Sequence, residues 1–139
     1  MSLEENKNIV RRYQEAYDTN NLDLLDEVVA PDLRSTAPTY PGMPSGLELA
    51  KQAHKVTLAV FPDFKQAIIE LIAEGDRVVM RFRATGSHSG APLMGMPPSG
   101  KKFDIVGISI FRIANGKIAE HWASEDQLGL MQQVGLLPS

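Results

Sequence analysis

The strongest candidate for proton transfer is Asp126, at the end of the last predicted strand. In the alternating pattern of that strand Asp126 shares the parity of Ile118 and Trp122, so all three are predicted to face inward. A carboxylate beside an aromatic wall is poorly solvated, which raises its pKa toward the range useful for acid–base catalysis. The alternatives are that Asp126 lies in solvent or caps a turn beginning at Gln127, and that a bulge exchanges it for Glu125.

The three histidines have different predicted places. His88 ends an alternating strand with the inward parity of Phe82, so it could donate a hydrogen bond to a developing oxyanion or shuttle a proton. The alternative for His88 is a rim position in a Ser-His-Ser turn. His121 has the parity opposite to Trp122 and is predicted to pack on the other side of the sheet or at a subunit interface. His54 is predicted to be a structural or surface histidine on a helix.

Aromatic and flexible apolar side chains could form the walls of a pocket around these groups. Trp122 is either a flat wall for an aromatic ligand or a core anchor, and the hydroxyls of Tyr13 and Tyr17 either reach a ligand or are satisfied within the core. An irregular apolar segment contains Met94 and Met96 and is either a lid or an interface loop. From these patterns, the residues expected to bind substrate are Trp122, Tyr13, Tyr17, Phe82, Met94 and Met96.

The elements that must position these residues follow from a change in hydrophobic period. Apolar residues recur at helical spacing in the first part of the chain, for example Ile9, Tyr13 and Ala16, and alternate with a period of two later on. The pattern predicts helices near residues 3–18, 22–29 and 46–60, a loop over 31–46, and strands near 64–73, 77–88, 103–113 and 117–126. Helices followed by antiparallel strands indicate an α+β fold, a curved sheet wrapped around N-terminal helices with a cone-shaped pocket.

Composition excludes several classes of function. The 139 residues carry a net charge of −3 and no cysteine. No basic field is present to hold nucleic acid or an anionic membrane, and the histidines have no metal-ligand spacing. Since no apolar run is long enough to cross a membrane, we expect a cytoplasmic protein with one domain over residues 1–139. Residues 1–3 could derive from an expression vector.

Several short motifs in a fixed order carry a family resemblance. They are Asn6 to Tyr13, Phe61-Pro62-Asp63, Ala73 to Val78, Gly86 to Gly90, Gly95 to Lys101, Gly107 to Arg112, Asn115 to Ile118, and Glu120-His121-Trp122 followed by Asp126 and Gly129-Leu130. Over about residues 5–136 the chain resembles the SnoaL-like polyketide cyclase (ester cyclase) family. This family lies within the fold superfamily of nuclear transport factor 2 and ketosteroid isomerase.

The resemblance implies a cone-shaped α+β barrel that forms a homodimer or homotetramer through sheet faces. It also implies ring closure of polycyclic polyketides by intramolecular aldol condensation, without metal or cofactor, with an aspartate near the end of the last long strand as acid and base. That aspartate corresponds to Asp126. The chain departs from the pattern at Thr36, where relatives often carry histidine. It also departs at Ser109, which the resemblance places among the substrate-binding residues and where some relatives have a stronger polar group.

The expected function is therefore that of a cyclase-type lyase or isomerase acting on a small apolar carbonyl compound, with no nucleic acid, membrane or cofactor involved. One alternative is a protein that only binds a small molecule or acts as an accessory. The other is an isomerase, dehydratase or hydrolase using the same pocket. Epoxide hydrolysis is disfavoured, because Arg77, Arg81 and Arg83 are predicted to point outward.

Overall fold

The computed structural model describes residues 2–35 and 46–138, so Thr36 and most of the expected loop over residues 31–46 lie outside the described residues. The elements are α1 (Leu3–Asp18), α2 (Leu24–Val28), β1 (Val29–Ser35), α3 (Gly46–Val60), β2 (Lys65–Glu74), β3 (Arg77–Ser87), β4 (Lys102–Ala114), β5 (Lys117–Glu125) and α4 (Gln127–Gln133). In these described parts, no helix combines the length and the apolar character needed to cross a membrane.

The strands form one five-stranded sheet in the order β1-β5-β4-β3-β2. β1 pairs with β5 in parallel, and the other neighbours pair antiparallel. The α+β class and the curved sheet are confirmed, but the sheet stays open, so the fold is not a closed barrel. β1 was not predicted because it is a short edge strand containing Pro31, a residue that sheets tolerate only at such positions.

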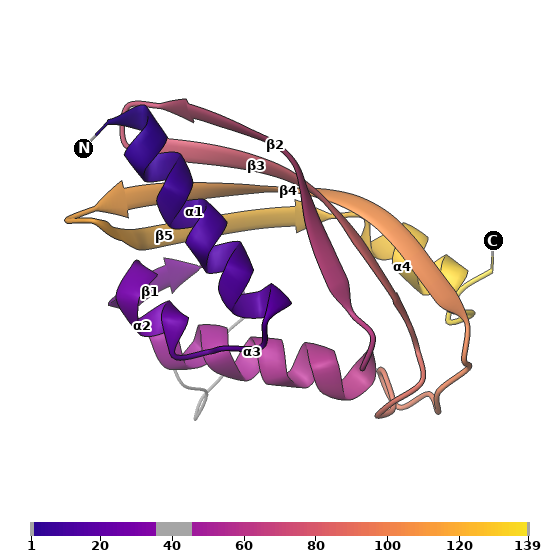
Figure 1. Ribbon diagram of the computed structural model, residues 1–139. Helices are drawn as coiled ribbons and strands as arrows, with labels where there is room; N and C mark the ends of the chain where they lie inside the picture. Colours follow the sequence, from indigo (N-terminus) through magenta and orange to yellow (C-terminus); the bar gives the residue numbers. More distant parts are fainter. Residues whose placement is uncertain (1, 36–45, 139) are drawn as a thin grey trace.

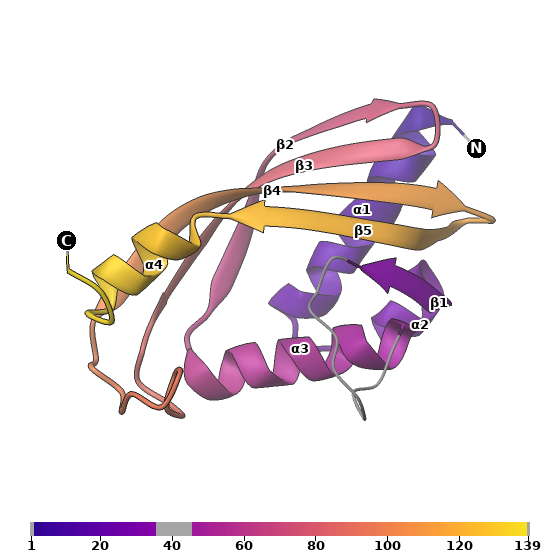
Figure 2. The ribbon, with the colours of Figure 1, turned by 180° about the vertical axis from the view of Figure 1, so that it is seen from behind.

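α1 crosses the concave face of the sheet, α3 runs along its open side, and α4 follows the end of β5 (Figure 1, Figure 2). Among the described residues, no helix crosses the middle of the opposite face. α1 begins with the predicted capping box, in which Ser2 and Glu5 exchange side-chain and backbone hydrogen bonds. Its apolar stripe, including Ile9 and Tyr13, is buried as predicted and belongs to the same core as the inner residues of β3 and β4.

An extra residue in β5 decides which side chains face the helices. Arg112 of β4 pairs with Glu120, but the next residue, Ile113, pairs with Ile118, which leaves Ala119 without a partner position. Successive side chains of a strand alternate between faces, so one extra residue reverses the orientation of every residue after it. Beyond the bulge, the odd-numbered residues of β5 therefore face inward.

The segment between β3 and β4 is held against the end of α3. The backbone N–H groups of Gly90 and Ala91 donate to the carbonyl oxygens of Val60 and Ala59, at 3.1 and 2.7 Å. A Cβ atom on Gly90 would lie only 2.0 Å from the Ala59 oxygen, so this close approach requires glycine. Because of these bonds the segment that carries Met94 has a fixed place beside α3.

Replacing Gly90 with alanine is therefore expected to lower the free energy of unfolding by about 1–3 kcal/mol, the usual cost of overpacking a close contact. Urea denaturation followed by circular dichroism measures the change. Ser89→Ala is the matched control, since the Ser89 side chain is exposed and makes no hydrogen bond to the described residues. Equal stability of the two variants would contradict this account of the loop.

Candidate active site

A pocket of about 540 Å³ lies between α1, α3 and the inner face of the sheet. This volume falls within the usual range for small-molecule sites. Its walls are mainly apolar, and the aromatic side chains among them are Tyr13, Tyr17, Phe61, Phe64 and Phe82. Apart from the two tyrosine hydroxyls, the polar side chains of the lining come from several elements: Ser35, His54, Thr57, Gln66, Ser109, His121, Glu125 and Gln127.

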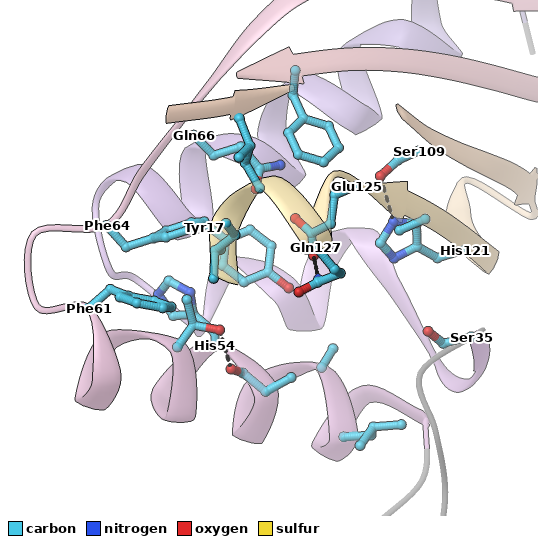
Figure 3. A pocket seen from close by; sticks show the side chains of 18 of the residues that line it. Tyr17, Ser35, His54, Phe61, Phe64, Gln66, Ser109, His121, Glu125 and Gln127 are labelled. Atoms are coloured by element: carbon cyan, nitrogen blue, oxygen red, sulfur yellow. Dashed lines mark hydrogen bonds between the residues drawn. The ribbon is translucent and has the colours of Figure 1, made fainter. Parts of the chain in front are cut away.

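Glu125, the last residue of β5, points into this pocket (Figure 3). Its Oε1 accepts a hydrogen bond of 2.9 Å from the side-chain amide of Gln127. The residue is exposed to solvent, yet the surrounding protein partly desolvates its carboxylate, and this desolvation raises the pKa of Glu125. A carboxylate with a raised pKa is a stronger base than one free in water.

His121 lies on the same wall, two inward positions before Glu125. Its ring stacks on Phe111 with the centroids 4.5 Å apart and the planes 5° from parallel, and Tyr13 packs edge-on at 5.8 Å. Its Nε2 is 3.1 Å from the Oγ of Ser109 on the neighbouring strand. Burial lowers the pKa of His121 to about 4, so the ring is neutral near pH 7.

Two tyrosines on α1 and a second histidine, on α3, also line the pocket. Tyr13 and Tyr17 pack edge-on at 4.8 Å, and burial raises the pKa of both hydroxyls. The ring of His54, on α3, packs against Tyr17 at 4.5 Å, and burial lowers the pKa of this histidine. All three side chains are therefore neutral near pH 7, with polar atoms at the edge of an otherwise apolar wall.

The lining contains no cation to balance a negatively charged ligand. Neither lysine nor arginine occurs among the described residues of the pocket, and the sequence over residues 36–45 contains none either. Within the described parts of the chain, no three acidic, histidine or cysteine side chains come together as a metal site would need. The arrangement offers one carboxylate and several neutral hydrogen-bonding groups in apolar surroundings.

Five of the predicted site residues line the pocket, namely Tyr13, Tyr17, Phe82, Met94 and Ser109. The predicted inward orientation of Asp126 is wrong. Its carboxylate is exposed, and Oδ1 accepts a 2.8 Å hydrogen bond from the backbone N–H of Gly129, which caps α4. The two alternatives predicted for the strand end both occur, because the bulge at Ala119 turns Glu125 inward and leaves Asp126 as the cap.

His88 faces inward as predicted but does not line the pocket. Its ring is buried against Phe61, and Nε2 donates to the carbonyl oxygen of Ala91 at 3.0 Å, so the side chain holds the loop after β3. Met96 also lies outside the lining and is half exposed. Its neighbour Met94 does reach the pocket, from a tight turn closed by backbone hydrogen bonds between Leu93 and Met96.

Trp122 was predicted to face the pocket, but the bulge turns it to the outer face of the sheet, where Arg77 packs over its ring at 5.3 Å. There it forms part of an apolar row across four strands, with Ile72, Val79 and Ile110 in register beside it. The expected homodimer or homotetramer through sheet faces stays a prediction. This partly exposed row is the kind of surface that such an assembly would cover.

The chain is similar to known proteins in sequence and in fold. The sequence model of SnoaL-like polyketide cyclases matches residues 7–134. The chain is 32% identical to the aklanonic acid methyl ester cyclase DauD of Streptomyces sp. (strain C5), over 91% of this chain and 80% of that protein. It is 28% identical to the nogalonic acid methyl ester cyclase of Streptomyces nogalater, over 86% and 90% of the two chains. The solved structure of TsrD from Streptomyces laurentii superposes with a TM-score of 0.87, at 29% identity over 99% of both chains.

The neutral state of His121 predicts how the stability of the protein depends on pH. Burial lowers the pKa of His121 from 6.5 to about 4, so below pH 6.5 the unfolded chain binds a proton that the folded chain does not. The free energy of unfolding therefore decreases as the pH falls. His121→Gln removes this pH-dependent contribution, because glutamine does not titrate. Between pH 7 and 5 the wild type is expected to lose about 2 kcal/mol more unfolding free energy than the variant.

Urea denaturation of both proteins at the two pH values measures this difference. His54, with a lowered pKa, and Glu125, with a raised pKa, titrate in both proteins, so their contributions cancel to a first approximation. The same loss of stability in wild type and variant would show that His121 is not held neutral by burial.

Proposed function

The chain belongs to the family of SnoaL-like polyketide cyclases, and from this premise we propose that it closes a ring by an intramolecular aldol reaction with Glu125 as the base. The observation that carries the proposal is the place of this carboxylate. Among the described lining residues, Glu125 is the one acidic side chain, and burial raises its pKa. A cyclase role also agrees with the names of the curated relatives.

The reaction begins at a carbon that lies between two carbonyl groups of the substrate. Glu125 removes a proton from this carbon, and the negative charge spreads over both carbonyl oxygens. The carbanion attacks a ketone carbon of the same molecule, so one C–C bond forms and the electron pair of the C=O bond moves to oxygen. This oxygen then takes a proton equivalent to the one that Glu125 gained. No atom enters or leaves, and the product is an isomer of the substrate.

The pocket contributes to catalysis mainly by holding the substrate in position. Aromatic side chains on α1, on β3 and in the turn after α3 can hold a flat ring system. A substrate held in this way has its two reacting carbons together at a high effective concentration. A base in a fixed position contributes roughly 10²–10⁴-fold beyond this. A ligand that fills the pocket also displaces water from Glu125, which raises its basicity further.

The same pocket favours a substrate without charge. A ligand carboxylate would lose its hydration, would find no lysine or arginine in the lining, and would lie near the carboxylate of Glu125. We therefore propose an ester of a polycyclic carbonyl compound as the substrate. An ester substrate agrees with the names of two curated relatives, which are cyclases of acid methyl esters.

Replacing Glu125 with glutamine is expected to lower kcat by about 10²–10⁴-fold, because the amide cannot accept the proton. Conversion of aklanonic acid methyl ester, followed by chromatography, measures turnover, and calorimetry measures binding, which should change little. Asp126→Asn is the matched control next to it, since asparagine also caps helices and should leave turnover within about twofold. Loss of turnover in Asp126→Asn with Glu125→Gln unaffected would overturn the assignment. A wild type that binds the ester without converting it would indicate a binding protein.

Aklanonic acid methyl ester is expected to bind at least about tenfold more tightly than the free acid at pH 7, a difference of about 1.4 kcal/mol. The physical reason is the cost of burying an unpaired carboxylate. Calorimetric titration of both compounds measures the ratio. In Glu125→Gln the ratio should shrink, because the repulsion from Glu125 is removed. Equal affinity, or tighter binding of the acid, would contradict the proposed substrate class.

A further inference from the structure

The two ring nitrogens of His121 have different surroundings. Nε2 is 3.1 Å from the Oγ of Ser109. Nδ1 has no hydrogen-bond partner among the described residues, and it is not sealed off from the pocket. Figure 3 shows the ring on the pocket wall, with one edge toward Ser109 and the other side turned toward the cavity.

The surroundings of Ser109 decide which nitrogen carries the proton. Ser109 is 2% exposed, and within the described parts of the chain its side chain bonds only to His121. If the hydroxyl donates to Nε2, its one proton is used. If it accepts from an Nε2–H group instead, its own O–H is buried without an acceptor, at a cost of about 1–3 kcal/mol. The favoured arrangement therefore puts the ring proton on Nδ1, which faces the pocket.

We propose that the Nδ1–H group of His121 donates a hydrogen bond to the ketone oxygen under attack, and that Ser109 is the positioning residue that fixes this tautomer. The inference rests on the proposed function and supplies the electrophilic partner that Glu125 needs. Stacking on Phe111 fixes the ring plane, so the donor is oriented before the substrate binds. Burial keeps the pKa of His121 near 4, so the ring donates as neutral imidazole at pH 7.

The strand separates this donor from the base by a suitable distance. His121 and Glu125 face the same side of β5 and are four residues apart, which corresponds to about 13 Å between their Cα atoms. Ala123 lies between them on the same face, and its methyl group leaves the space open. The α-carbon can thus approach the carboxylate while the ketone oxygen approaches the imidazole.

In this arrangement the electron pair of the ketone moves onto its oxygen while that oxygen accepts the hydrogen bond from Nδ1–H. The histidine keeps its proton throughout the attack, and the oxygen is finally protonated from Glu125 or through solvent. Loss of one such donor typically lowers kcat by about 10²–10³-fold. Tyr17 carries another hydroxyl of the pocket lining that could donate to the same oxygen, so the test includes it.

The tautomer can be measured without any turnover. In ¹⁵N NMR spectra of labelled protein at pH 7, Nδ1 of His121 should have the shift of a protonated nitrogen and Nε2 that of an unprotonated one. In Ser109→Ala the preference should weaken or reverse, and Ser109→Thr should restore it, since threonine keeps the hydroxyl. A proton on Nε2 in the wild type would overturn the role of Ser109 and of Nδ1.

Two replacements of His121 distinguish the roles of its two ring nitrogens in kinetic measurements. The amide of asparagine lies where Nδ1 was, whereas the amide of glutamine reaches toward Ser109. His121→Gln is therefore expected to lower kcat by about 10²–10³-fold with little change in KM, and His121→Asn should retain clearly more activity. Tyr17→Phe is expected to change kcat far less than His121→Gln. Equal activity of the two His121 variants, or a larger loss in Tyr17→Phe, would overturn the inference.

Failure of the inference about His121 can be distinguished from failure of the proposed function. If Glu125→Gln retains turnover, the base has been misassigned, while the His121 pair still reports on the oxyanion donor. If the wild type binds the ester but does not convert it, the cyclase function and the catalytic role of His121 are both contradicted. The NMR result then still decides whether Ser109 fixes the tautomer.

Discussion

The site depends on one irregularity in strand pairing. Between β4 and β5, Arg112 pairs with Glu120 and Ile113 with Ile118, so Ala119 is an extra residue in β5. Ile118 stays in the core on one side of this bulge, while beyond it His121 and Glu125 turn into the pocket and Trp122 turns out. Without the bulge, the alternation would turn Trp122 and Asp126 toward the pocket in place of His121 and Glu125. A local change in register thus sets the chemistry of the whole cavity.

The electrostatics of the pocket follow from burial. His121, His54 and the two tyrosines are neutral near pH 7 because apolar surroundings disfavour their charged forms. The same surroundings raise the pKa of Glu125, which makes it a better base. One carboxylate and neutral donors, with no cation in the described lining, suit a reaction that moves protons within an uncharged substrate.

Much of the fold could be predicted from the sequence, because α1, α3 and the four long strands have clear periods of 3.6 and 2. β1 could not, since Val29–Ser35 alternates poorly, contains Pro31 and exists only by pairing with a strand far along the chain. The pocket walls at Tyr13, Tyr17 and Phe82 were found by the same periodicity, whereas Ser109 was found only through the family resemblance. The strand end was misassigned because parity was counted from Ile118 through position 119, and nothing in the local sequence marks the bulge there. Glu125 was available only as the alternative that a bulge would create, and His121 was placed on the wrong face for the same reason.

The orientation of β5 can be tested most directly with single cysteines, because the chain has none of its own. In Ala123→Cys the thiol should lie in the pocket, and in Ser124→Cys on the outer face. A saturating amount of aklanonic acid methyl ester should slow the reaction of Ala123→Cys with a maleimide and leave that of Ser124→Cys unchanged. Protection of Ser124→Cys in place of Ala123→Cys would show that the strand faces the other way and would remove the basis of the account.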